Sequence, residues 1–132
     1  MSAKPLFVLL VGENVRSSLL PWLKARGARC QFARSYRDAS FLIFYTGFDL
    51  VLSEYQLPDR TAFPLLDLLE GSSATLFFGT RVEDGSLWLR MLEGGKRCIG
   101  VPLLRSHELT TALATLLNAP VEQSQQEAVS AG

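Results

Sequence analysis

Several signals that often reveal a function are missing from this sequence of 132 residues. It has one histidine and two cysteines, and these form no metal-binding pattern. Thirteen basic residues balance thirteen acidic ones, so no net charge attracts nucleic acid or anionic lipid. There is no signal peptide and no apolar run of about 18 residues. We therefore predict a cytoplasmic protein that contacts neither nucleic acid nor a membrane directly.

Signatures of nucleotide binding and nucleophilic catalysis are missing as well. The sequence contains no glycine-rich phosphate loop, no dinucleotide fingerprint and no nucleophile elbow around Ser17 or Ser53. The one histidine, His107, is expected in the first turn of the last helix, where a surface position is a better interpretation than a catalytic base. We predict no catalytic residue, no metal and no cofactor.

What the sequence does contain is an alternation of short apolar runs with helical segments. It predicts strands at 6–11, 30–33, 50–54, 75–78 and 98–101. Helices are predicted after caps at Ser17 or Ser18, Ser35, Thr61, Asp84 or Ser86, and Ser106. Residues 1–118 are assigned to one domain. Residues 119–132 have little to bury and are expected to form a disordered tail.

The stretch FDLVLSEYQLPDRTAF, residues 48–63, organises the rest of the chain. Leu50 to Leu52 form a buried strand that ends in the polar pair Ser53-Glu54, and Leu57-Pro58-Asp59 forms a turn. This segment resembles the third strand and following loop of response-regulator receiver domains. In those domains the strand ends in a phosphoacceptor aspartate, and Leu-Pro-Asp follows. In this sequence Glu54 stands at the acceptor position.

The alternation of five strands with five helices predicts a doubly wound α/β fold. The resemblance implies the flavodoxin-like receiver fold, a five-stranded parallel sheet in the order 2-1-3-4-5. In that order Cys30 and Cys98 lie on opposite edge strands. Four strand spacings separate them by about 19 Å, which is beyond the reach of a disulfide.

The resemblance also implies further site positions, and most of these have changed. Receivers carry two acids after the first strand to hold magnesium, whereas this sequence has Gly12 and Glu13. The hydroxyl expected at the end of the fourth strand is replaced by Gly79, with Thr80 one residue later. The switch aromatic of the fifth strand aligns with Cys98, and the lysine before the following proline aligns with Val101.

These changes bear directly on phosphorylation. Formation of an acyl phosphate needs an in-line carboxylate, a divalent cation and a lysine that neutralises the transferred charge. Glu54 is one methylene longer than aspartate, one metal-binding acid is missing, and the lysine is absent. We therefore predict that Glu54 is not phosphorylated.

Two predicted helices are more apolar than a surface helix should be. The second helix carries consecutive apolar residues from 41 to 45, which cannot all face the sheet. We expect Phe41 and Tyr45, four residues apart, to point outward. Exposed patches of this kind usually mark an interface. The interface candidates on the second and fourth helices are Phe41, Phe44, Tyr45, Trp88 and Met91.

The function predicted from the sequence is that of a degenerate receiver-like domain in bacterial-type signalling. It would act by protein–protein contact without phosphorylation, and its partner would be a signalling protein or a second copy of the chain. One alternative is a receiver locked in an active-like state by Glu54. An alternative of another class is an enzyme on the same fold that uses Glu13 and Glu54 as a metal or acid/base pair.

Overall fold

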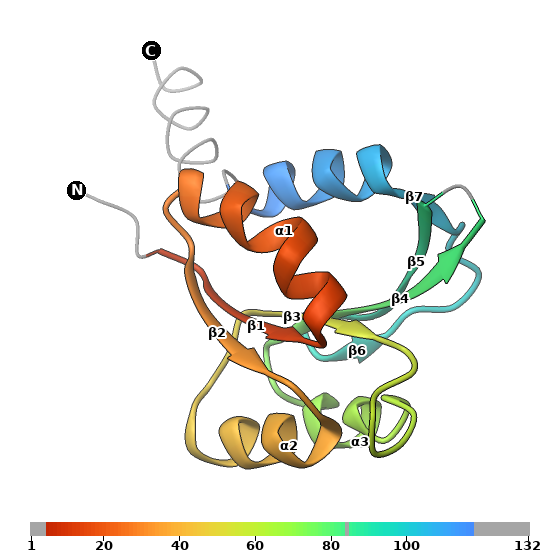
Figure 1. Ribbon diagram of the computed structural model, residues 1–132. Helices are drawn as coiled ribbons and strands as arrows, with labels where there is room; N and C mark the ends of the chain where they lie inside the picture. Colours follow the sequence, from red (N-terminus) through yellow and green to blue (C-terminus); the bar gives the residue numbers. More distant parts are fainter. Residues whose placement is uncertain (1–4, 84, 118–132) are drawn as a thin grey trace.

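The computed structural model describes residues 5–83 and 85–117. One sheet runs through this part of the chain in the order β2-β1-β3-β4-β5-β6, with β7 paired to β5. The helix α1 and the last described helix, residues 106–117, cover one face of the sheet, while α2 and α3 cover the other (Figure 1). The predicted α/β class, the helices on both faces and the strand order 2-1-3-4-5 are therefore confirmed.

Four neighbouring strands form the parallel part of the sheet. They are β1 (Phe7–Val11), β2 (Arg29–Ala33), β3 (Leu50–Glu54) and β4 (Thr75–Val82). In the centre, Val8 pairs with Cys30 on one side and with Leu50 on the other. The central strands are buried on both faces, which explains why their sequences are continuously apolar and do not alternate.

The fifth strand is antiparallel, and this contradicts the predicted all-parallel sheet. β5 (Gly85–Glu93) forms a hairpin with β4, so that Val82 pairs with Gly85 and Gly79 with Trp88. The predicted fourth helix is wrong. The dipeptide Asp84-Gly85 between two apolar stretches is a strong hairpin signal, which the reading of Asp84 as a helix cap overlooked.

Two short strands complete the sheet at its β5 edge. β6 (Lys96–Arg97) forms a second hairpin with the end of β5, in which Glu93 pairs with Lys96. The turn between them is Gly94-Gly95, and both glycines have a positive φ. β7 (Leu104–Arg105) pairs with the other end of β5. The predicted strand at 98–101 is therefore wrong. Cys30 lies in the edge strand β2 and Cys98 lies outside any strand, and both cysteines are free.

The helix boundaries differ from the predictions in two places. α1 (Glu13–Ala25) begins before the predicted caps Ser17 and Ser18, so Pro21 lies inside the helix and not in its first turn. α3 (Leu65–Leu69) is a short helix preceded by Pro64, not by a cap at Thr61. α2 (Tyr36–Tyr45) is confirmed with its cap, since the Ser35 Oγ accepts a hydrogen bond from the Asp38 N–H at 3.2 Å.

Apolar side chains form a core on each face of the sheet. Leu9, Val51 and Phe78 pack toward α2 and α3, whereas Leu10, Leu52 and Phe77 pack toward α1 and residues 106–117. None of the described helices has the length and the apolar content needed to cross a membrane. The tail predicted at 119–132 lies outside the described residues.

Candidate functional site

Three of the predicted site residues meet at the carboxyl edge of the parallel strands. Glu54 is the last residue of β3 and pairs in register with Gly79 of β4. Gly12 directly follows β1, the other neighbour of β3. This edge is where open α/β sheets place their ligands.

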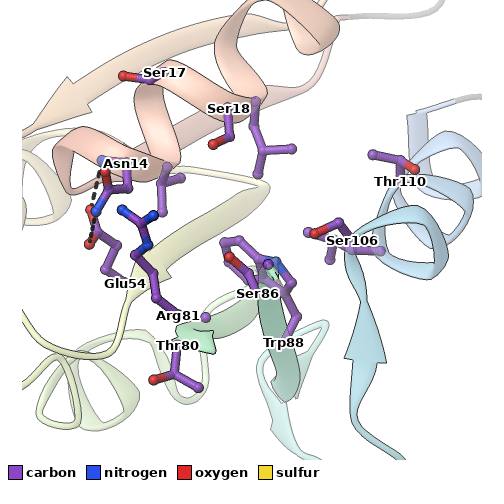
Figure 2. A pocket seen from close by; sticks show the side chains of 15 residues that line it. Asn14, Ser17, Ser18, Glu54, Thr80, Arg81, Ser86, Trp88, Ser106 and Thr110 are labelled. Carbon is purple, nitrogen blue, oxygen red and sulfur yellow. Dashed lines mark hydrogen bonds between the residues drawn. The ribbon is translucent and has the colours of Figure 1, made fainter. Parts of the chain in front are cut away.

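The Glu54 carboxylate caps the N-terminus of α1. Its Oε2 accepts a hydrogen bond from the backbone N–H of Asn14 at 2.9 Å, and its Oε1 accepts one from the Asn14 side chain at 3.3 Å (Figure 2). Gly12 occupies the N-cap position of α1 and has no side chain to do this. The negative charge of Glu54 also lies at the favourable end of the helix dipole. This cap, supplied by β3, explains why α1 starts earlier than its own sequence predicts.

Gly12 makes room for the Glu54 side chain. Its φ is 107°, a conformation that only glycine adopts readily. A Cβ at this position would lie 2.6 Å from the Glu54 Cδ and 2.8 Å from its Cγ. The glycine at 12 and the longer acid at 54 therefore fit each other, and an aspartate at 12 would clash with Glu54.

The neighbouring acid, Glu13, binds elsewhere. Its Oε2 accepts hydrogen bonds from the Arg16 Nη2 at 2.9 Å and Nε at 3.2 Å. Glu13 is thus hydrogen-bonded to Arg16, and Glu54 is hydrogen-bonded to Asn14. This arrangement gives no support to the hypothesis that the two acids act together as a metal site or an acid/base pair. Among the residues placed by the structure, no three His, Cys, Asp or Glu side chains gather as a metal site would require.

Gly79 is packed against an aromatic ring. A Cβ on Gly79 would lie 2.7 Å from the Trp88 Cζ3, so the indole of β5 occupies the space that a side chain at position 79 would need. Thr80 is exposed. Cys98 and Val101 lie in the irregular segment between β6 and β7, and neither lines the cavity described next. Burial raises the pKa of the Cys98 thiol.

A cavity of about 440 Å³ opens beside these strand ends, between α1, the β4–β5 hairpin and the start of the helix 106–117 (Figure 2). Its polar lining includes residues that the sequence analysis did not select, because they lie on the mispredicted hairpin or on helices: Ser18, Arg81, Ser86, Ser106 and Thr110. The hairpin signal Asp84-Gly85 would have pointed to Arg81 and Ser86. His107 is exposed in the first turn of residues 106–117, as predicted.

Asp59, the acid of the Leu-Pro-Asp turn, caps the second helix. Its Oδ1 and Oδ2 accept hydrogen bonds from the backbone N–H groups of Tyr36 and Arg37, both at 3.0 Å. Desolvation acts to raise the pKa of Asp59, but these two N–H groups, the backbone N–H of Asp59 itself and the charge of Arg60 together outweigh it, and the pKa is lowered. The last residue of β3 thus caps α1, and the loop that follows β3 caps α2.

We predict that Asp59→Ala lowers the free energy of unfolding by about 0.5–1 kcal/mol at pH 7, the value of an exposed helix cap. Because the folded pKa is lowered, this stabilisation is fully present above the unfolded pKa of about 4 and is lost as pH falls through the folded pKa. Urea unfolding of both proteins at pH 7 and pH 3 tests this. A difference that stays the same at pH 3 would contradict the prediction.

Three aromatic side chains of α2 are exposed, and for Phe41 and Tyr45 this confirms the prediction, while Leu42 and Ile43 pack against the core. The exposed fractions are 62% for Phe41, 81% for Phe44 and 69% for Tyr45. The rings of Phe41 and Phe44 lie 4.8 Å and 5.0 Å from that of Tyr45, centre to centre. These three residues are called the α2 aromatic cluster below.

The two interface candidates on the predicted fourth helix are corrected. Trp88 and Met91 belong to β5, and the pleat of a strand turns them to opposite faces of the sheet. Trp88 is only 5% exposed and packs in the core beneath α1, whereas Met91 is partly buried against the other core. Neither contributes an exposed aromatic or apolar patch comparable to that of α2.

Comparison of the chain with protein-family models, with curated proteins and with solved structures finds no match.

Proposed function

We propose that this chain is a degenerate receiver-like domain of bacterial-type signalling that docks another protein and is not phosphorylated. The observation that carries the docking function is the exposure of the α2 aromatic cluster. An aromatic side chain left in water forgoes about 1.5–3 kcal/mol relative to a buried one, and a protein surface packed on the cluster recovers part of this. The cytoplasmic location predicted from the sequence is part of the proposal.

The strand-end site supports the absence of phosphorylation. Both oxygens of the Glu54 carboxylate accept hydrogen bonds from Asn14, so neither is presented free to a phosphoryl donor. Trp88 lies across Gly79, where a receiver would place the hydroxyl that contacts the phosphoryl group. The alternative in which Glu54 imitates a phosphorylated aspartate needs the same hydroxyl, so it is favoured less.

The charges around the cluster favour a second copy of the chain as the partner. Arg37 and Asp38 lie beside Phe41 and Tyr45 in one groove, which α3 closes with Leu68. In a two-fold symmetric pair, Arg37 of one copy can face Asp38 of the other around a shared aromatic centre. A signalling protein of a different kind is the other possible occupant.

The double substitution Phe41→Ser with Tyr45→Ser tests this proposal. Both residues are exposed, so we expect a Tm within a few degrees of the wild type and at least a tenfold weaker self-association. Sedimentation velocity up to about 0.5 mM detects an interface with a Kd near 0.1 mM. Acetyl phosphate with magnesium should change neither the mass of the protein nor its association.

The matched control is Ile99→Ser with Leu103→Ser, which removes two exposed apolar side chains outside α2 and should leave association unchanged. A wild type that stays monomeric over the whole concentration range contradicts self-association and leaves a different protein as the occupant. A variant that loses several kcal/mol of stability contradicts a surface role for the cluster.

A further inference from the structure

The cavity of Figure 2 gathers hydrogen-bond donors from three separate elements. Arg81 comes from β4, Ser86 and Trp88 come from β5, and Ser106 lies at the start of the helix 106–117. Figure 2 shows Arg81 reaching from β4 toward α1, with Ser86 and Trp88 between Arg81 and Ser106 in this view. The hairpin β4–β5 therefore brings together side chains that an α-helix at 84–92 would have separated.

Arg81 provides the positive charge of this cavity. Within residues 5–83 and 85–117, the salt bridges of the protein involve Arg16, Arg90 and Arg97, and no carboxylate lies within 4.0 Å of the Arg81 guanidinium. Glu54 is the one carboxylate in the lining, and its two oxygens already accept hydrogen bonds from Asn14. The guanidinium, with five N–H donors, is therefore available to an anion.

Trp88 adds a second donor that the fold does not use. The residue is only 5% exposed, yet its indole N–H donates to no described residue. Within the described residues, every side-chain nitrogen or oxygen that is fully shielded from solvent has a hydrogen-bond partner. Because the indole N–H has none, it must be accessible to solvent. Because Trp88 lines the cavity, we infer that the N–H opens into it. A nearly buried donor of this kind favours a ligand that supplies an acceptor.

The hydroxyl groups divide into two sets. Those of Ser17 and Thr110 donate to the backbone carbonyls of Glu13 and His107, both at 2.9 Å. Those of Ser18, Thr80, Ser86 and Ser106 donate to no described residue and are available to a ligand. Each available group of the lining can therefore donate, and the Arg81 guanidinium and the Trp88 N–H can do nothing else. The volume is within the range of about 300–1,000 Å³ typical of small-molecule sites.

We propose that this cavity binds, without covalent chemistry, a small anion that carries several acceptor oxygens, such as a phosphate ester or a polycarboxylate. Arg81 binds the anionic group, and the Trp88 N–H and the free serine hydroxyls bind its oxygens. The site lies on the face of the sheet opposite to α2, so it does not depend on the docking surface.

Thermal unfolding and calorimetric titration with three probes test the proposal: ribose 5-phosphate, citrate and uncharged ribose. We expect one or both anions to raise the Tm by about 5 °C at roughly ten times their Kd, and ribose to leave it unchanged. The preference between ribose 5-phosphate and citrate tells a phosphate ester from a carboxylate. No Tm increase with either anion at about 20 mM, or a response to ribose alone, would overturn the proposal.

Two variants locate the binding. Arg81→Gln should weaken binding of the anion at least tenfold, and Trp88→Phe, which removes the N–H but keeps the benzene ring, should weaken it severalfold. Arg29→Gln is the matched control, because Arg29 is exposed at the start of β2 and lines neither the cavity nor the docking groove, and it should bind as the wild type does. The same affinity in Arg81→Gln as in Arg29→Gln would place the anion elsewhere and overturn the assignment.

Discussion

Replacing Gly12 with alanine is expected to lower the free energy of unfolding by about 3–5 kcal/mol. The φ of 107° costs a non-glycine residue about 1–3 kcal/mol. The new Cβ would also lie 2.6 Å from the Glu54 Cδ, and relieving such an overlap costs about 1–3 kcal/mol. If Glu54 moves away, α1 loses its cap as well, which costs about 1 kcal/mol. Urea unfolding followed by circular dichroism measures the sum.

Gly27→Ala separates the two causes. Gly27 also has a positive φ, of 82°, but a Cβ there would meet nothing within 4 Å. It therefore reports the backbone strain alone, and its cost should be at least about 1 kcal/mol smaller. In a Glu54→Ala background, Gly12→Ala should cost less than in the wild type, because the steric conflict is gone. Equal costs at positions 12 and 27 would contradict the close fit of Gly12 to Glu54.

Gly79→Ala is expected to cost about 2–3 kcal/mol, although its backbone is not strained. The added methyl would lie 2.7 Å from the Trp88 Cζ3 and 2.8 Å from its Cε3 and Cη2. Trp88 is nearly buried in one core cluster with Leu109 and Leu113 of the helix 106–117, so its ring cannot swing out into water without losing its core contacts. Serine or threonine, which add the same Cβ and a hydroxyl besides, should be at least as destabilising.

The control for this substitution is Gly47→Ala. Gly47 has an ordinary φ and open space around it, so alanine there should be neutral or slightly stabilising. Combining Gly79→Ala with Trp88→Leu should cost less than the sum of the two single changes, because leucine leaves room for the methyl. Additive costs would show that Gly79 and Trp88 do not conflict.

Local sequence predicted the parts of the fold whose causes are local. Ser35 and Asp38 are three residues apart, and their hydrogen bond begins α2 at the expected residue. The apolar run ending in Ser53-Glu54 forms β3, and Glu54 lies at its carboxyl end as predicted. The excess of aromatic residues on α2 was likewise visible, because one face of a helix cannot bury so many consecutive apolar positions.

The β4–β5 hairpin was missed because its apolar residues fit two structures. Leu87, Trp88 and Leu89 are consecutive apolar residues, so neither helical periodicity nor strand alternation distinguishes a helix from a strand here. The dipeptide Asp84-Gly85 was the available hairpin signal. Because Arg81 and Ser86 lie on this hairpin, the cavity that they line was missed together with it.

The sequence by itself determined the α/β class, the four parallel strands, the capped second helix and the place of Glu54 at the end of β3. Only the tertiary structure decided what Glu54 does and why Gly12 and Gly79 are glycines. The reason is that these residues are far apart in the chain and meet only when the sheet forms. Glu54 then reaches Asn14 across 40 positions, and Trp88 packs on Gly79 from the neighbouring strand.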